Sequence, residues 1–230
     1  LAVEGGFDLP TAMGSHSTYT RGGFGGFKGR QLASDDELSL ILPAATDRDE
    51  LRFVERTLPG EPPIRVIPGP QADFFTAAAL DTLFSREYTV SAAVDRMGMR
   101  LNGPQLEHAR GFNITSDGTA PGSIQVPGDG LPIVLLADRQ TTGGYPKIGC
   151  VISADLPTLA RLRPGSTIRF SKSTLEQATE ARRERENWFA RFLDQIKRAG
   201  TSGIIDPTAL QTQNLVSGVV GPDDPADSDR

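Results

Sequence analysis

The stretch that decides the fold is Ile133–Ser153, which reads IVLLADRQTTGGYPKIGCVIS. It begins and ends with short aliphatic runs, Ile133–Ala137 and Ile148–Ser153, which predict two strands. Between them lies a polar cluster, Asp138–Lys147, that contains two glycines. Polar groups that fold against a protein must be hydrogen-bonded or solvated. We therefore predict a polar ligand site between two buried strands.

Other parts of the chain show the same pattern of short aliphatic runs next to turn residues. Among its 230 residues, 25 glycines and 17 prolines punctuate short β-branched runs, a pattern typical of an all-β barrel or sandwich. Six further strands are predicted, at Leu38–Leu42, Ile64–Ile67, Tyr88–Val94, Gly98–Leu101, Ser123–Val126 and Thr167–Phe170. The first residues, Leu1–Val3, resemble a strand interior that runs into a turn at Gly5 and Gly6. This beginning indicates that an N-terminal part is missing.

Two short helices are predicted to interrupt the strands. The first, Ala72–Phe84, follows a Pro-Gly-Pro sequence. Its apolar stripe consists of Phe74, Ala77, Ala78 and Leu83. The second, Leu156–Leu162, carries Pro157 in its first turn, where the missing backbone N–H costs nothing.

A third helix is the clearest element of the sequence. Ser173 and Glu176 have the spacing of a capping box, and Gly200 lies where a helix-ending glycine belongs. The residues that repeat at helical spacing are Phe189, Phe192, Leu193 and Ile196. Charges of alternating sign in Arg182–Glu186 favour a solvated face over a binding site. From Gly221 onward the chain reads as a disordered tail.

Charge and cysteine content exclude several classes of protein. The formal charge is −5, but five aspartates and one arginine after residue 200 carry −4 of it. The nearly neutral remainder has no stripe of lysines interleaved with aromatic residues, so a nucleic-acid partner is not expected. The single cysteine, Cys150, offers no support for an oxidising compartment. Without a membrane-length apolar run or a signal sequence, we expect a cytoplasmic protein that does not enter a membrane.

Residues 21–30, RGGFGGFKGR, look at first like a phosphate loop. A Walker loop needs Ser or Thr after its lysine, and Lys28 is followed by Gly29; the dinucleotide glycine spacing fails as well. What the segment offers is a set of approachable backbone N–H groups beside the charge of Arg21. Alternatively, it is a wide turn packed by two phenylalanines.

The polar cluster holds most of the candidate binding residues. These are Arg139, Gln140, Thr141, Thr142, Tyr145 and Lys147. Lys147 is one of only four lysines beside twenty arginines, and an ammonium next to a glycine turn can bind a carboxylate or phosphate as a point charge. Alternatively, Lys147 is an ordinary surface lysine.

Two arginines flank Gly98, and together Arg96 and Arg100 could hold an anionic substrate. Alternatively, both pair structurally with carboxylates such as Asp95. The two histidines, His16 and His108, have no metal-like spacing, and Cys150 has apolar neighbours. Neither a metal site nor a thiol nucleophile is predicted, and the catalytic residue stays unknown.

Several segments together resemble the family of the 5-oxoprolinase C subunit, also called allophanate hydrolase subunit two or KipA-like. They are Gly5–Asp8, Gly14–Tyr19, the Arg21 glycine stretch, Val66–Gln71, Asp95–Leu101, Ile124–Pro127, Ala137–Ile148 and Arg169–Phe170. The Asp-Arg-Gln-Thr-Thr-Gly-Gly-Tyr-Pro-Lys block is highly specific. The departures are Asp117, where relatives often carry Glu, and Cys150, where Ala or Thr is common.

The resemblance implies a mostly-β, cyclophilin-like barrel with a few helices, including a C-terminal one. Residues 1–70 would then be the remainder of an N-terminal carboxyltransferase subdomain, residues 71–200 the cyclophilin-like subdomain with its closing helix, and residues 201–230 a flexible acidic tail. Residues Arg21, Ser116 and Gln125 join the substrate-binding set of Arg96, Arg100 and the polar cluster. Such donors suit an amide whose oxygen gains negative charge.

The family further implies work in a complex. With the A and B subunits of 5-oxoprolinase, the latter KipI-like, it opens the lactam of 5-oxo-L-proline to L-glutamate and uses ATP, which may bind one of the partners. A sister use is the carboxyltransferase step of a urea carboxylase, in which biotin comes from another chain. A third alternative is a non-catalytic module that regulates a KipI-like partner.

Overall fold

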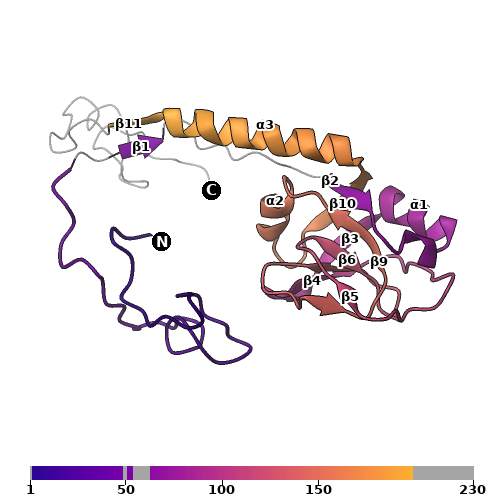
Figure 1. Cartoon of the computed structure of the whole chain (residues 1–230), viewed down its shortest axis with the longest axis horizontal. Helices are drawn as coiled ribbons and strands as arrows, with labels where there is room; N and C mark the ends of the chain where they lie inside the picture. Colours follow the sequence, from indigo (N-terminus) through magenta and orange to yellow (C-terminus); the bar gives the residue numbers. More distant parts are fainter. Residues whose placement is uncertain (1, 49–50, 54–62, 199–230) are drawn as a thin grey trace, which may run out of the picture. The chain divides into compact units, whose positions relative to one another are not determined.

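A closed barrel of seven strands dominates the computed structural model, which describes residues 2–48, 51–53 and 63–198. The strand order is β10-β2-β9-β6-β7-β4-β3, and every neighbouring pair is antiparallel except β10 with β2 (Figure 1). The strands are β2 (Ile64–Pro68), β3 (Glu87–Val94), β4 (Gly98–Asn102), β6 (Ser123–Gln125), β7 (Ile133–Leu135), β9 (Lys147–Val151) and β10 (Thr167–Lys172). The prediction of a mostly-β barrel with a few helices, one of them C-terminal, is confirmed.

The barrel closes because its strands carry inward-facing apolar residues at alternate positions. In β2, for example, Ile64 and Val66 are buried and Arg65 between them is not. Tyr88 from β3 and Phe170 from β10 meet inside with ring centroids 6.0 Å apart. The Tyr88 hydroxyl has no hydrogen-bond partner, and burial raises the pKa of Tyr88 to about 12.

The two short helices differ in detail from the prediction. Instead of one helix over residues 72–84, a 3-10 turn, η1 (Ala72–Phe74), precedes α1 (Ala77–Ser85). Thr76 interrupts them because its side chain caps α1 by accepting from the Ala79 N–H at 3.1 Å. Ala79 and Leu83 form the buried face, whereas the predicted stripe members Ala77 and Ala78 are exposed. The second helix, α2 (Leu156–Ala160), carries its proline in the first turn as predicted.

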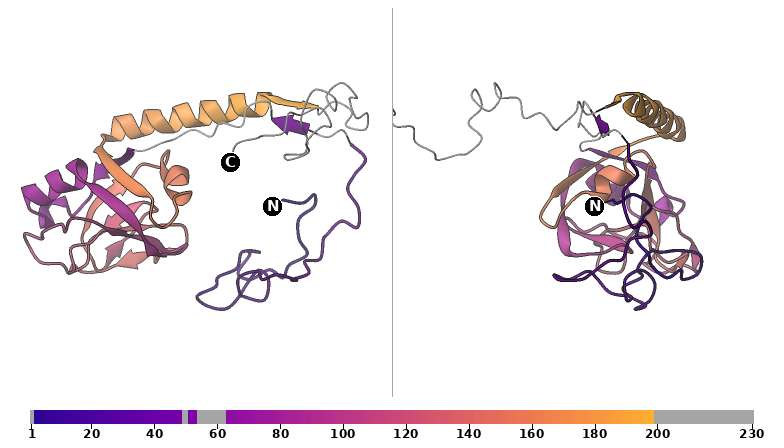
Figure 2. Two further views of the ribbon diagram at one scale, coloured as in Figure 1. Left: turned by 180° about the vertical axis from the view of Figure 1, so that it is seen from behind. Right: turned by 90° about the vertical axis from the view of Figure 1, so that its left-hand side faces the viewer.

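The long helix α3 (Leu175–Asp194) begins one residue later than predicted. Its capping box is formed by Thr174 and Gln177, not Ser173 and Glu176, because the Thr174 hydroxyl reaches the Gln177 N–H at 3.2 Å. Ala178 and Ala181 pack with Ile152 of the barrel wall. The second half of α3 extends past the barrel (Figure 1, Figure 2).

At its far end the helix stops before Ile196, which the prediction had included. Ile196 instead starts the short strand β11 (Ile196–Arg198), which pairs with β1 (Leu51–Phe53). Nearby, the ring of Phe192 stacks on Phe53 with centroids 4.3 Å apart and on Trp188 at 4.9 Å. The predicted helix-ending Gly200 lies outside the described residues.

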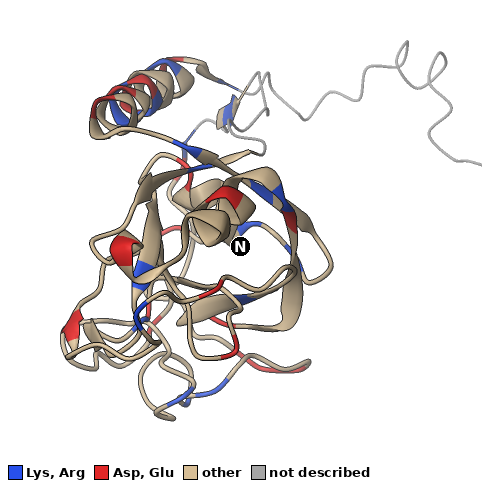
Figure 3. Cartoon of the chain, turned by 90° about the vertical axis from the view of Figure 1, so that its right-hand side faces the viewer, with Lys and Arg blue, Asp and Glu red and all other residues tan. Residues whose placement is uncertain are grey.

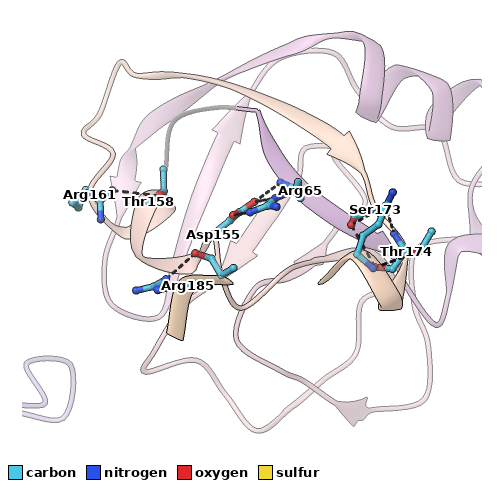
Figure 4. A network of polar contacts seen from close by, with 9 residues as sticks. Arg65, Asp155, Thr158, Arg161, Ser173, Thr174 and Arg185 are labelled. Atoms are coloured by element: carbon cyan, nitrogen blue, oxygen red, sulfur yellow. Dashed lines mark hydrogen bonds and ion pairs between the residues drawn. The ribbon is translucent and has the colours of Figure 1, made fainter. Parts of the chain in front are cut away.

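The Asp155 carboxylate joins the start of α2 to β2, and an arginine of α3 contacts the residue beside it (Figure 4). Asp155, 7% exposed, accepts from the Arg65 guanidinium at 2.6 and 3.0 Å and from the Arg65 backbone N–H at 2.8 Å. Beside it, Arg185 of α3 donates to the Ala154 carbonyl at 2.7 Å. Arg65 therefore links β2 to the start of α2, and Arg185 links α3 to the same loop.

Residues 2–48 adopt a different kind of structure. Two predicted strands are wrong here: residues 2–3 are irregular, and Leu38–Leu42 contributes only one isolated bridge, between Leu40 and Phe7. The segment is instead a succession of turns, and all of its described glycines except Gly22 have positive φ. The aliphatic side chains stay exposed or half-buried, so no strand pairing is stabilised by a core.

The chain divides into two units, Leu1–Leu51 with Arg198–Arg230, and Arg52–Lys197. The barrel includes β2, which lies on the N-terminal side of the boundary expected at residue 70. The predicted flexible tail, residues 201–230, lies outside the described residues. Figure 3 shows acidic and basic residues interspersed along the barrel ribbon.

Candidate functional site

The polar cluster folds back on the barrel as a small two-stranded ribbon. Strands β5 (Asp117–Gly118) and β8 (Thr142–Gly143) pair in antiparallel register, and we call this pair the β5–β8 ribbon. The ribbon continues at both ends, because Thr119 N–H donates to the Thr141 carbonyl at 2.9 Å and Ile114 N–H to the Gly144 carbonyl at 2.9 Å. The Thr119 hydroxyl also donates to the Gln140 carbonyl. These contacts fix the segment that follows β7.

Lys147, at the start of β9, is buried rather than a surface lysine, with only 3% of its surface exposed. Its Nζ lies 3.0 Å from Asp117 Oδ2 in the ribbon. Gln71 completes the arrangement: its Nε2 donates to the same carboxylate oxygen at 3.1 Å, and its Oε1 accepts from the Lys147 backbone N–H at 3.2 Å. Hydrogen bonds from Lys147 and then from Gln71 hold the pKa of Asp117 below its usual value.

Gln125 lies directly across from Lys147 in the β6–β9 register and is 2% exposed. Its Oε1 accepts from Gln140 Nε2 at 3.2 Å, while its own Nε2 has no hydrogen-bond partner. A Cβ at Gly143 would lie 2.3 Å from that Nε2, so a larger residue there would require the Gln125 side chain to move. Gln125 and Lys147 thus place a buried amide N–H and a buried ammonium at paired positions of adjacent strands.

Chemically, this arrangement supplies what a reacting amide needs. An amide oxygen gains negative charge when a nucleophile adds to the carbonyl carbon, and fixed donors stabilise that charge without reorganising. The Lys147 ammonium and the Gln125 Nε2–H are such donors, and Asp117 orients the ammonium. We call Lys147, Asp117, Gln71, Gln125 and Gln140 the amide site.

The predicted arginines of the barrel unit make contacts of their own. Arg96 makes a two-point ion pair with Asp138, at 2.7 and 2.9 Å. Arg100 reaches Asp129 in the β6–β7 connection at 3.1 Å. Both arginines therefore pair with carboxylates, as the alternative interpretation had it, although the partners are not Asp95. Arg139 donates from Nη2 to the Thr119 carbonyl at 3.4 Å.

Comparison with known proteins now gives the family. The family model for the carboxyltransferase domain, subdomain A and B, matches residues 1–172. The chain belongs to this family. It is 41% identical over 189 residues to the 5-oxoprolinase C subunit of Escherichia coli, covering 82% of this chain and 60% of that protein. It is also 41% identical over 201 residues to the 5-oxoprolinase C subunit of Haemophilus influenzae, covering 86% and 62%.

A solved structure carries the same fold within a much longer protein. The urea amidolyase of K. lactis superposes with a TM-score of 0.69 at 26% identity, over 85% of this chain and 14% of that chain. The present carboxyltransferase-family chain thus spans about 60% of the length of its curated bacterial relatives. The resemblance expected from the sequence motifs is confirmed.

Most of the predicted binding residues of this carboxyltransferase-family chain lie close to the β5–β8 ribbon. Those that lie in or beside the β5–β8 ribbon are Ser116, Gln125, Arg139, Gln140, Thr141, Thr142, Tyr145 and Lys147. Arg96 joins them through Asp138. Arg100 pairs elsewhere, and Arg21 belongs to the other unit of the chain. Sequence reasoning missed Gln71 and gave no role to Asp117, since neither stands in a chemically suggestive pattern.

Two absences apply only to the part of the chain that the structure describes. Residues 2–48, 51–53 and 63–198 contain no group of three or more His, Cys, Asp or Glu side chains suited to a metal ion. Within the same ranges, no helix has the length and apolar character to cross a bilayer. His108 is engaged locally, since its Nε2 lies 3.0 Å from the Val126 carbonyl.

Proposed function

We propose that this chain is part of one component of an ATP-dependent 5-oxoprolinase complex that opens the lactam of 5-oxo-L-proline to L-glutamate. The observation that carries the proposal is the amide site, where a buried ammonium and a buried, unpartnered amide N–H lie on adjacent strands. The 41% identity to two proteins named as the C subunit of 5-oxoprolinase supports this substrate. The chain spans only about 60% of the length of those relatives, so the activity of the whole enzyme is part of this proposal.

In this mechanism the lactam carbonyl oxygen binds at Lys147 Nζ and Gln125 Nε2, which stabilise its developing negative charge. Asp117 and Gln71 position the ammonium. Gln140 orients the Gln125 side chain by donating to its Oε1. The remaining substrate-binding residues, including Arg139, Thr141, Thr142 and Tyr145, line the approach along the polar cluster. We assign no general base.

The glycine segment, residues 21–30, does not have the geometry of an ATP-binding phosphate loop. A phosphate loop relies on a helix N-terminus directly after its glycines, and residues 31–48 contain no helix. Lys28 itself has positive φ and lies over the Phe27 ring, 4.9 Å from its centroid. In this proposal ATP binds a partner, and the partners are the A and B subunits, the latter KipI-like. The chain has a single cysteine, which agrees with the cytoplasmic location that we propose.

The test is 5-oxoproline-dependent ATP hydrolysis and glutamate release by the full-length chain mixed with its A and B partners. Lys147→Ala should lower the rate about a hundredfold or more, the loss typical of removing one fixed oxyanion donor. Lys172→Ala removes an exposed lysine of β10 and should leave the rate unchanged. Circular dichroism and co-purification with the partners would check that both variants fold and assemble. A fully active Lys147→Ala complex would refute the assignment of the amide site.

A second candidate function is the carboxyltransferase step of a urea carboxylase-type enzyme, favoured by the structural match to a urea amidolyase. The same donors would stabilise the amide oxygen of urea, with biotin supplied by another chain. Carboxylation of urea without any turnover of 5-oxoproline would favour this candidate. Inactivity with both substrates, together with retained binding of a KipI-like partner, would favour a regulatory module instead.

A further inference from the structure

A cavity lies at the other end of the polar cluster, away from Lys147. Its volume is about 850 Å³, within the range of sites that hold small molecules. The β3–β4 turn, the segment after β7 and helix α2 line it, and one side is open to solvent. Its apolar wall is formed by Val94, Met99, Leu136, Leu156, Pro157 and Leu162. Such a lining binds hydrocarbon or aromatic groups by removing them from water.

The charged groups of this cavity are Asp95, Arg96 and Arg139. Asp95 is occupied, because its Oδ1 accepts from the backbone N–H groups of Met97 at 2.8 Å and Gly98 at 3.0 Å. Arg96 is neutralised by its two-point ion pair with Asp138. These contacts leave little attraction for a ligand at either side chain.

Arg139 differs from both. Its Nε is buried and has no hydrogen-bond partner, and Nη2 makes only a long contact to a carbonyl, at 3.4 Å. Among the described residues, no carboxylate lies within ion-pair distance of it. A guanidinium presents several donors in a fixed fork that matches a carboxylate. An unsatisfied buried donor of this kind favours any ligand that completes its hydrogen bonds.

We propose that this cavity binds a small monocarboxylate with an apolar body, whose carboxylate pairs with Arg139 while its body lies against Met99, Leu136 and α2. We call it the carboxylate cavity. This binding goes beyond the proposed amide chemistry, since the ligand is held by Arg139 and the apolar wall and needs neither Lys147 nor Gln125. The cavity and the amide site are joined by the polar cluster, which contributes Arg139 at one end and Lys147 at the other.

The probe is octanoate, titrated into the full chain, with octanamide as the uncharged control of the same length. Calorimetry should detect octanoate binding that is about tenfold or more tighter than octanamide binding, because only the acid makes charge-assisted hydrogen bonds. Arg139→Met should weaken octanoate by about tenfold or more and bring it level with the amide. Lys147→Met should not change octanoate affinity.

A matched pair of alanines tests the apolar wall. Ala160 lines the carboxylate cavity at the end of α2, whereas Ala78 is an exposed alanine of α1 outside it. Ala160→Glu adds bulk and negative charge to the wall and should abolish octanoate binding, while Ala78→Glu should leave it intact. Both positions are helical and solvent-facing, so neither variant disturbs the core.

Methionine methyl NMR then locates the ligand. The chain has three methionines; Met99 lines the cavity, and Met13, 94% exposed in residues 2–48, provides an internal reference. Octanoate should shift the Met99 methyl signal and leave that of Met13 unchanged. The proposal is overturned if octanoate does not bind, if acid and amide bind equally well, or if Lys147→Met removes binding while Arg139→Met preserves it. The first two results do not involve Lys147 and would leave the amide site to its own test, 5-oxoproline-dependent ATP hydrolysis.

Discussion

The barrel and residues 2–48 share the same sequence texture, glycine turns between short aliphatic runs, but fold in different ways. The barrel buries aliphatic side chains from every one of its strands. In residues 2–48 no apolar side chain is buried; the only buried residues there are Gly26 and Gly29. Glycine turns between short aliphatic runs therefore do not by themselves produce a barrel. What distinguishes the two regions is whether alternate residues can meet a common core, because burial of apolar surface drives the folding.

The largest expected effect is a loss of stability, which compares a buried leucine of the barrel unit with an exposed leucine of residues 2–48. Leu83 of α1 is 0% exposed, whereas Leu40 is 50% exposed. Leu83→Ala leaves a cavity under α1 and should lower the free energy of unfolding by about 2–5 kcal/mol. Leu40→Ala should change it by less than about 0.5 kcal/mol. Urea denaturation of the full chain, followed by circular dichroism, measures both. Equal losses would mean that residues 2–48 also contribute a core.

The same contrast explains how much of the fold could be predicted from the sequence. Strands such as Ile64–Ile67 and Tyr88–Val94 are predicted well, since both segments are short and rich in β-branched or aromatic residues. Leu38–Leu42 has similar composition but forms one isolated bridge only. Its local pattern is compatible with a strand, yet pairing depends on distant partners that a single stretch does not reveal.

The candidate site was predictable where its residues were contiguous. The cluster Asp138–Lys147 was recognised because so many polar groups follow a buried strand. Gln71 and Asp117 reach Lys147 from 76 and 30 residues away, respectively. The two-residue strands of the β5–β8 ribbon have no periodicity to detect. The capping box was misplaced by one residue because Ser173-Thr174 offers two adjacent hydroxyls.

A smaller effect concerns the glycines, which serve different purposes in the two regions. In residues 2–48 they permit positive φ, but Gly69 in the barrel permits close approach: a Cβ there would lie 2.2 Å from the Lys147 carbonyl oxygen. Gly69→Ala should therefore cost about 1–3 kcal/mol through backbone displacement. Gly118→Ala, where no atom lies within 4 Å of the added Cβ, is the matched control. Equal thermal unfolding temperatures for the two variants would contradict this interpretation.

The smallest expected effect is the pH dependence of stability that comes from Asp117 in the β5–β8 ribbon. Hydrogen bonds from Lys147 and Gln71 lower the pKa of Asp117, so the folded state binds the Asp117 proton more weakly than the unfolded chain does. The resulting stabilisation is complete above the unfolded pKa of about 4 and is lost as the pH falls through the lower folded value. Asp117→Asn removes this titration without changing the shape of the side chain.

The measurement is the difference in urea midpoint between wild type and Asp117→Asn from pH 7 down to the acid limit of folding. Wild type should be the more stable protein at neutral pH, and the difference should shrink as Asp117 becomes protonated. Asp73→Asn is a suitable comparison, because Asp73 pairs with Arg110 on the surface and does not contact Lys147. A difference that stays constant with pH would contradict this interpretation, because it would mean that the ionisation of Asp117 does not contribute to stability.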